Sequence, residues 1–407
     1  MAVTGVVLGG LVLGGCASAT AGASGTAGTA AAAPSTVASS ATAVTWEVLQ
    51  EDFALHPETD GLSADQLYAT GKQYETGDGQ VQWYGMAQAY YTAAQAAGNT
   101  DAEAALKRLE DHKAEVLAAS PDGQGAIFDF FRAGVTAGQK EDYEAAYAIF
   151  HDDAFFFQDP LYRGLGSIAD LVRDGNGRAQ DINLATELYQ YSAETLGKGN
   201  GWTSMGLLYE AADGTYPGIT HSDDVALAYF LRSYDSSQVK ETDFKGPRYA
   251  GDLYEAGYVH DDSTKAAPDP AAALAAYLVA ANGNGRTFDG TSAYKLAVLY
   301  DKGSDGVEQN DAEALKYYEK AISDPNVHAT MLGIPQTYLA LGEFYEKGRG
   351  TTVDLATAKK YYKQALDAAD ENLALKEAAG SKDAQAVHDE ATAALKRLAA
   401  GTGQKNG

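Results

Sequence analysis

Small and bulky apolar positions alternate along this chain in a pattern that recurs over most of its length. A large, mostly aromatic residue stands at Tyr74, Phe131, Val172, Tyr209, Tyr254, Tyr300 and Tyr345. Three positions before each comes a mostly small residue, at Gly71, Phe128, Ala169, Gly206, Gly251, Ala297 and Gly342. Three positions after each come Gly77, Gly134, Gly175, Ala212, Gly257, Gly303 and Gly348. The recurrence predicts one structural unit repeated along the chain.

A second set of positions follows each of the first. It consists of an alanine, at Ala87, Ala145, Ala185, Ala226, Ala273, Ala314 and Ala358, and a large residue four positions later, at Tyr91, Ile149, Tyr189, Phe230, Tyr277, Tyr318 and Tyr362. Residues three or four apart share one face of a helix, so each unit predicts two helices. The small residue lets the neighbouring helix approach, and the aromatic ring fills the space beside it. A single pair cannot bury its apolar face but stacked pairs can, which predicts a solenoid.

Helix start and stop residues support the same division. Each glycine that follows the first aromatic position can adopt a positive φ and end the first helix. Asp181, Asp311 and Asp354 precede the alanine position by three or four residues, where an N-cap of the second helix belongs. Asp269 is followed by Pro270, a cap with proline at the first helical position. Ser63 and Gln66 predict a capping box ahead of the first unit.

The pattern small-x-LYExG followed by DxxxA and two tyrosines resembles the SEL-one-like repeat, a relative of the tetratricopeptide repeat. The resemblance covers about residues 62–368, is strongest in the last three units, and is weakest at 120–165, where Phe128 and Asp152 replace small residues. It implies an all-α, right-handed α-solenoid of about seven helix-turn-helix repeats. With a capping helix from DAQAVHDEATAALKRLAA, this domain is predicted at 47–399, followed by a disordered tail at 400–407. For function, the resemblance implies an adaptor that binds a protein or peptide and is not an enzyme.

The first 46 residues predict an exported lipoprotein. Residues 1–15 form a short apolar run ending in LGG before Cys16, which resembles a bacterial lipobox with Cys16 as the lipid attachment site. The run is too short to span a bilayer. Residues 16–46 are almost only Ala, Ser, Thr and Gly and predict a flexible tether that reaches about 30 Å. We therefore expect the folded domain at the cell envelope, held to a membrane by its lipid and facing the periplasm or the exterior.

Charge narrows the choice of partner. The chain carries 30 Lys and Arg against 56 Asp and Glu, a formal net charge of −26. A surface of this sign repels phosphate backbones, which excludes nucleic acid as an expected ligand. A basic protein surface remains compatible, and a glycan bound by acidic and tyrosine side chains is the alternative partner.

Motifs for catalysis are weak. The chain has no G-x-S-x-G, no phosphate-binding glycine loop and no H-E-x-x-H. Ser237 and Lys240 match S-x-x-K, but the companion motifs S-D-N and K-T-G are absent. Some cysteine-rich relatives of this repeat family are linked to β-lactam binding or hydrolysis, but they depend on a disulfide in each repeat and this chain has one cysteine. We expect no enzyme activity and no cofactor.

Three local features are candidate binding residues. Two long loops each carry a histidine close to two acids, His221 with Asp223 and Asp224, and His260 with Asp261 and Asp262. Corresponding loops of stacked repeats emerge on the same edge, so the two clusters are expected to approach each other and either hold a divalent cation or only cap a helix. Tyr216 lies in the first loop. Phe155, Phe156 and Phe157 cannot all face one core from one helix, so they are buried by neighbouring helices or form an adhesive patch.

Overall fold

The computed structural model describes residues 44–159, 161–235, 237, 239–283, 288–323, 333–374 and 381–403. Over these residues the secondary structure is helical, and the only β pairing is three isolated bridges. The prediction of an all-α fold is confirmed. Cys16, the leader and nearly all of the tether lie outside the described residues. No helix within the described ranges is both long and apolar enough to cross a membrane.

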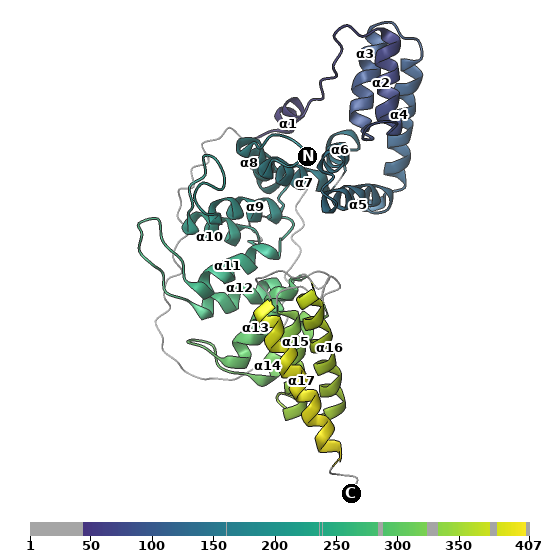
Figure 1. The fold of residues 1–407 in the computed structure, drawn as a ribbon. Coiled ribbons are helices and arrows are strands. Elements are labelled where there is room, and N and C mark those ends of the chain that lie inside the picture. The colour runs from purple at the N-terminus through teal and green to yellow at the C-terminus, as the bar shows by residue number, and fades with distance from the viewer. Residues whose placement is uncertain are drawn as a thin grey trace, which may run out of the picture. The chain divides into compact units, whose positions relative to one another are not determined.

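Helices that are adjacent in sequence pack as pairs (Figure 1). The pairs are α2 (Ala64–Thr76) with α3 (Tyr84–Ala96), α5 (Ala126–Gln139) with α6 (Tyr143–His151), α7 (Arg163–Asp174) with α8 (Ile182–Gln190), α9 (Gly199–Glu210) with α10 (Asp223–Arg232), α11 (Lys245–Ala256) with α12 (Pro270–Asn282), α13 (Gly290–Lys302) with α14 (Asp311–Ala321), and α15 (Ile334–Lys347) with α16 (Leu355–Ala374). The remaining elements are α1 (Trp46–Asp52), α4 (Ala102–Ala118), a 3-10 turn η1 (Pro121–Gly123), π turns η2 (Asp152–Phe156) and η3 (Tyr191–Thr195), and α17 (Ser381–Gly403).

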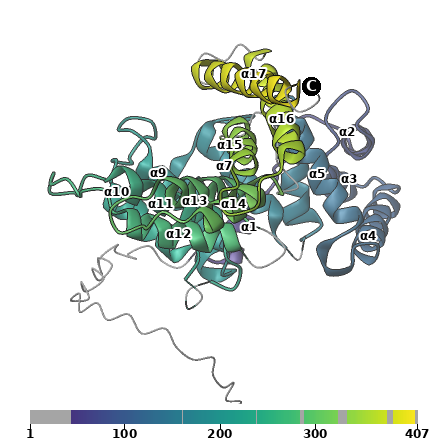
Figure 2. The ribbon, with the colours of Figure 1, turned by 90° about the horizontal axis from the view of Figure 1, so that it is seen from below.

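From α5–α6 onward each pair also packs on the next, which makes the fold an α-solenoid, and α4 joins the α2–α3 pair to α5. Contacts between pairs join α6 to α7, α8 to α9, α10 to α11, α12 to α13 and α14 to α15. The long helix α17 lies against α16 and α15, as Figure 2 shows from a second direction. It continues to Gly403, so the helix extends beyond residue 399, where the sequence analysis placed its end.

The small residue three positions before each first aromatic position lets an aromatic ring lie directly on a helix backbone. A Cβ added to Gly251 of α11 would lie 2.6 Å from Cδ1 of Tyr277 on α12, and one added to Gly342 of α15 would lie 2.6 Å from Cδ1 of Tyr362 on α16. Both rings are fully buried. The predicted pairing of small and aromatic positions is thus confirmed, with the contact made by the ring of the second helix.

Most helix ends follow the predicted residues, and three differ. Gly77, Gly175, Gly257, Gly303 and Gly348 are C-caps with positive φ. Ser63 and Gln66 form the capping box, and the Asp181, Asp269 and Asp354 side chains accept hydrogen bonds from the first turns of α8, α12 and α16. The cap of α14 is Asn310, one residue before the predicted Asp311. The C-cap of α9 is Ala211 instead of Ala212.

The predicted register of the α5–α6 pair is wrong. Gly134 lies inside α5, where a Cβ would lie 2.6 Å from Cε1 of Phe150, so it occupies the small position that was assigned to Phe128. On α6, Ala146 and Phe150 are buried, each one residue after the predicted Ala145 and Ile149, which are only half-buried. Lys140, and not Gly134, is the C-cap of α5. Glycine fits both a helix end and a ring contact, which is why the sequence pattern gave the wrong register here.

Candidate functional site

A groove of about 510 Å³ lies between the first helices of the last repeats and the capping helix. Val298 of α13, Leu339 of α15 and Val387 of α17 give it apolar walls, and Phe344 of α15 lies beneath them with 1% of its surface exposed. A groove with apolar walls drawn from three helices can accept the side chains of a partner segment.

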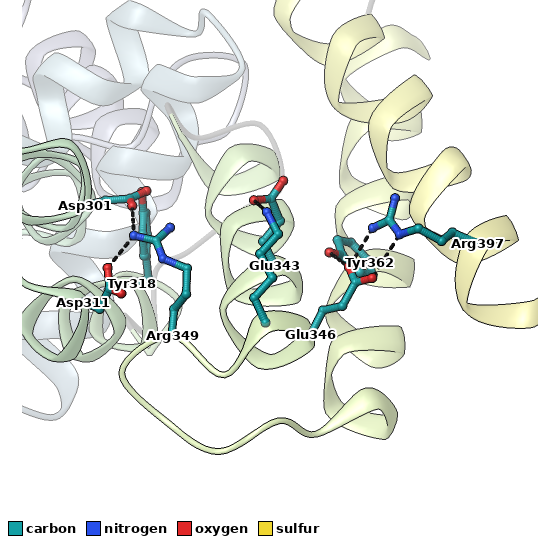
Figure 3. Close-up of polar contacts among 9 residues, drawn as sticks. Asp301, Asp311, Tyr318, Glu343, Glu346, Arg349, Tyr362 and Arg397 are labelled. Carbon is teal, nitrogen blue, oxygen red and sulfur yellow. Dashed lines mark hydrogen bonds and ion pairs between the residues drawn. The ribbon is translucent and has the colours of Figure 1, made fainter. Parts of the chain in front are cut away.

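Acidic side chains surround these walls. The groove is lined by the acids Asp301, Glu343, Asp383 and Glu390 and by the bases Lys302 and Arg349. Arg349 is already bonded to Asp301 and Asp311, as Figure 3 shows. Asp383 and Glu390 are exposed and have no ion-pair partner within the described ranges. The groove therefore offers unpaired negative charge to a ligand.

One buried acceptor in the groove also lacks a partner. The side-chain oxygen Oε1 of Gln336, on α15, is enclosed and receives no hydrogen bond from any described residue. Buried acceptors are nearly always satisfied in folded proteins, by protein, water or ligand. A ligand that donates an N–H group suits this position.

The helices that form the groove are fixed by polar clamps. In each clamp, a buried tyrosine of the second helix hydrogen-bonds to an acid of the first, and a base from a segment that follows the pair binds the same acid. Tyr362 donates to Glu346 at 2.6 Å, and Arg397 of α17 binds Glu346 through two bonds of 2.7 and 3.0 Å (Figure 3). The Arg397 hydrogen bond lowers the pKa of Glu346, because it favours the ionised carboxylate. Tyr318 and Arg349 bind Asp301 in the same way.

Two earlier pairs have the same clamp, and a third pair has a variant of it. Tyr91 and Arg108 share Glu75, and Tyr277 and Lys295 share Asp252 and Glu255. Tyr189 bonds to Asp170, but there the base is Arg173 of the same helix. Where the ring is Phe150 or Phe230, no hydroxyl is present and no clamp forms.

The two histidine loops meet as predicted. The backbone N–H groups of Val259 and Asp261 donate to Asp223 and Asp224 at 2.9 and 3.0 Å, and the His260 ring lies 2.8 Å from Asp224. His221 lies 3.2 Å from its own Asp223. The N-cap of α10 is Ser222, so the acids join the two loops instead of capping the helix. No group of metal-ligating side chains suited to an ion occurs in the described part of the chain, and the cation hypothesis gains no support.

The remaining predicted candidates are mostly packed. Phe156 and Phe157 are in the core, with 4% and 0% of their surfaces exposed. Phe155 is half-buried and stacks between Trp46 and Phe53. These contacts agree with the alternative in which neighbouring helices bury the three phenylalanines. Tyr216 is half-buried beneath the Arg173 guanidinium, whose carbon lies 6.0 Å from the ring centre. The Ser237 hydroxyl donates to Asp235.

The sequence analysis missed a buried acidic cluster beside the phenylalanines. Asp152 accepts hydrogen bonds from the N–H groups of Tyr84 and Gly85 at the start of α3, and Asp153 accepts one from Gly164 at the start of α7. The π turn η2 thus binds helix starts of the preceding and following pairs. Burial raises the pKa of Asp153 to about 7. The available signal was the pair of adjacent acids just before three phenylalanines. Acids next to a buried apolar segment are buried with it only when they are hydrogen-bonded, so the pattern indicates a hydrogen-bonded acidic cluster.

Asp153 predicts a specific pH dependence. Folded Asp153, whose pKa is raised to about 7, keeps its proton up to about pH 7, whereas the unfolded side chain loses it near its ordinary pKa of 3.8. Its contribution to stability is therefore present below pH 3.8 and is lost as the pH rises to 7. We expect the free energy of unfolding of the wild type, relative to Asp153→Asn, to fall by up to about 1.4 kcal/mol per pH unit over this range. Urea unfolding of both proteins at several pH values measures it, and a constant difference would exclude the shift.

The stacked helix pairs define this protein as an α-solenoid repeat protein. Its residues 163–194, 291–326 and 335–370 match the family model described as Sel1 repeat, so the chain contains Sel1 repeats at these three places. This is the SEL-one-like family that the sequence resembles, and the resemblance is confirmed. Sel1-repeat proteins generally mediate protein–protein interactions and are typically scaffolds without catalytic activity.

Two solved structures are similar in part. A Sel1 repeat protein from Oxalobacter formigenes is 20% identical, over 65% of this chain and 96% of that one, with a TM-score of 0.39. The second, c5321, is a protective antigen present in uropathogenic Escherichia coli strains that displays an SLR fold. It is 17% identical, over 82% of this chain and 84% of that one, with a TM-score of 0.33. No curated protein matches the sequence.

Proposed function

We propose that this protein is a scaffold that binds a basic segment of a partner protein in the groove between α13, α15 and α17. The observation that carries the proposal is the combination of apolar walls with the unpaired acids Asp383 and Glu390. Lysine and arginine have aliphatic stems that pack on apolar surface while their charged ends reach a polar rim. The unpartnered Gln336 oxygen supplies an acceptor for an N–H donor from the same segment.

Charge reversal in the groove tests this proposal. The probes are three labelled peptides, alternating Lys–Leu, Lys–Ser and Glu–Leu. We expect the Lys–Leu peptide to bind about tenfold more tightly than the others, and Glu343→Lys with Glu390→Lys to remove about the same factor. Fluorescence anisotropy at low and high salt measures both effects, since exposed charges are screened by salt.

The matched control makes an equal change of charge outside the groove. Asp367 and Glu371 are exposed acids on α16, so Asp367→Lys with Glu371→Lys should leave Lys–Leu binding unchanged. If both double variants weaken binding equally, the net charge attracts the peptide and the groove does not. Equal binding of the Lys–Leu and Lys–Ser peptides would contradict a role for the apolar walls.

The proposal also places the scaffold at the bacterial cell envelope, anchored through a lipid on Cys16. Its support is the sequence pattern of residues 1–46, an apolar leader, a cysteine and a tether. In a bacterial host, we expect the wild type to incorporate a radiolabelled fatty acid and to fractionate with membranes. Cys16→Ser should abolish the label and lower the membrane fraction. Unchanged membrane association of an unlabelled protein would contradict lipid anchoring.

A further inference from the structure

A second cavity, of about 320 Å³, lies between α7 and α9 and is independent of the groove. One wall is the segment 241–243, which is held against the start of α9 by a bond of 2.7 Å from the Gly199 N–H to the Glu241 carbonyl. Its volume is at the lower end of the range typical of small-molecule sites. The cavity is therefore sized for a compact ligand.

Neutral hydrogen-bonding groups form part of the lining of this cavity, beside five charged side chains. It is lined by the hydroxyl and amide side chains of Ser167, Asn200, Ser204 and Thr242. None of these four side chains has a hydrogen-bond partner within the described residues. Their unused donors and acceptors can each bind a hydroxyl group of a ligand.

The charged groups of the cavity, two bases and three acids, are already engaged. Among the acids, Asp170 accepts hydrogen bonds from Tyr189 and Arg173, and Asp243 accepts one from the Lys245 N–H. Arg163 bonds to buried Asp159 at 2.9 Å and to the Gly123 carbonyl at 2.6 Å. The Lys198 ammonium bonds to the Leu161 carbonyl and lies 3.8 Å from Glu241. An anion would have to break the bonds of the two bases and would also meet three carboxylates, so the cavity favours a ligand without negative charge.

Aromatic rings complete the lining. Phe131 and Tyr162 are half-buried at the cavity, where the apolar face of a ligand can pack on them. Tyr162 has a φ of 50°, a left-handed conformation that is strained in a residue with a side chain. Backbone strain of this kind is concentrated at ligand sites. A sugar ring combines the two required properties, hydroxyl groups at its edge and an apolar C–H face.

We propose that this cavity binds a neutral saccharide unit. A saccharide suits the cavity because unpartnered hydroxyl and amide groups lie beside two aromatic rings, and because the cations Arg163 and Lys198 are already bonded to protein groups. A site built to hydrogen-bond hydroxyl groups rejects ligands that lack them. The protein would then bind a glycan at one repeat interface and a protein segment at another.

Saturation-transfer NMR of the full chain tests the proposal with glucose, galactose, mannose and N-acetylglucosamine, and with acetate and glutamate as anions. We expect at least one sugar to bind at millimolar concentration, and Asn200→Ala with Ser204→Val to weaken it about tenfold. Thr352→Val, at an exposed loop position, should change nothing. No sugar signal, a signal unaffected by the cavity variant, or variant-sensitive binding of the anions alone would each overturn the proposal. Glu343→Lys with Glu390→Lys should leave sugar binding intact, which separates this site from the groove.

Discussion

Replacing Gly251 by alanine should destabilise the protein by about 1–3 kcal/mol, although alanine is the better helix former. The added Cβ would lie 2.6 Å from Cδ1 and 2.9 Å from Cζ of Tyr277. The ring cannot move easily, because it is fully buried and its hydroxyl is within hydrogen-bond distance of Asp252 and Glu255. Ala297 occupies the equivalent small position of α13, so a methyl group is accepted where the two helices of a pair are far enough apart. In the α11–α12 pair the two helices lie too close for one.

A second glycine provides the control for this prediction. Gly138 also lies inside a helix, α5, but a Cβ there would meet only Cβ of Ala146, at 3.9 Å. Gly138→Ala should therefore stabilise the protein by about 0.5–1 kcal/mol, since alanine loses less backbone entropy in a helix. Denaturant unfolding followed by circular dichroism measures both variants. Two changes of the same sign would refute the ring-on-backbone contact as the source of the effect.

Replacing Glu346 by alanine should cost about 2–3 kcal/mol and loosen the capping helix. The substitution leaves the buried Tyr362 hydroxyl without its acceptor and removes both bonds to Arg397. A buried polar group that loses its partner costs about 1–3 kcal/mol, and bonds to charged groups contribute more than neutral ones. Hydrogen exchange in α17 should increase along with the loss of global stability, because Arg397 belongs to that helix.

A double-mutant cycle separates the clamp from general damage. Tyr362→Phe removes the hydroxyl and keeps the ring on Gly342. If the clamp is a unit, Glu346→Ala should cost less in the Tyr362→Phe background than in the wild type, with a coupling of about 1 kcal/mol. Lys347→Ala on the same helix is the control, because its bond to Glu343 is exposed and contributes little. Additive costs for Glu346 and Tyr362 would show that the two side chains act independently.

The sequence predicted the contacts within a helix pair better than those between pairs. Gly251 and Tyr277, like Gly342 and Tyr362, lie in helices that are adjacent in sequence. The spacing of such pairs recurs along the chain and can be recognised from the sequence alone. The register of the α5–α6 pair was missed because Gly134 could equally end a helix. The clamps were missed because their bases come from segments beyond the pair, as Arg397 of the capping helix does for Glu346, 51 residues away.

The candidate sites were predictable to different degrees. The approach of the loops around His221 and His260 followed from stacking alone, because equivalent loops emerge on one edge. The groove could not be inferred, since Val298, Leu339 and Val387 come from three helices and each looks like an ordinary core position. The cavity beside Asn200 was hidden for the same reason. Which polar side chains lack partners is a property of packing and not of sequence spacing.

The most direct test of the scaffold function is photo-crosslinking in the producing cell from a single position in the groove. A photoreactive phenylalanine analogue at Leu339 should capture one defined protein, and peptide mapping should locate the link beside a lysine or arginine of that protein. The same analogue at Lys359, on the exposed part of α16, should not capture it. Equal capture from both positions, or links to segments without basic residues, would contradict the groove as the binding site.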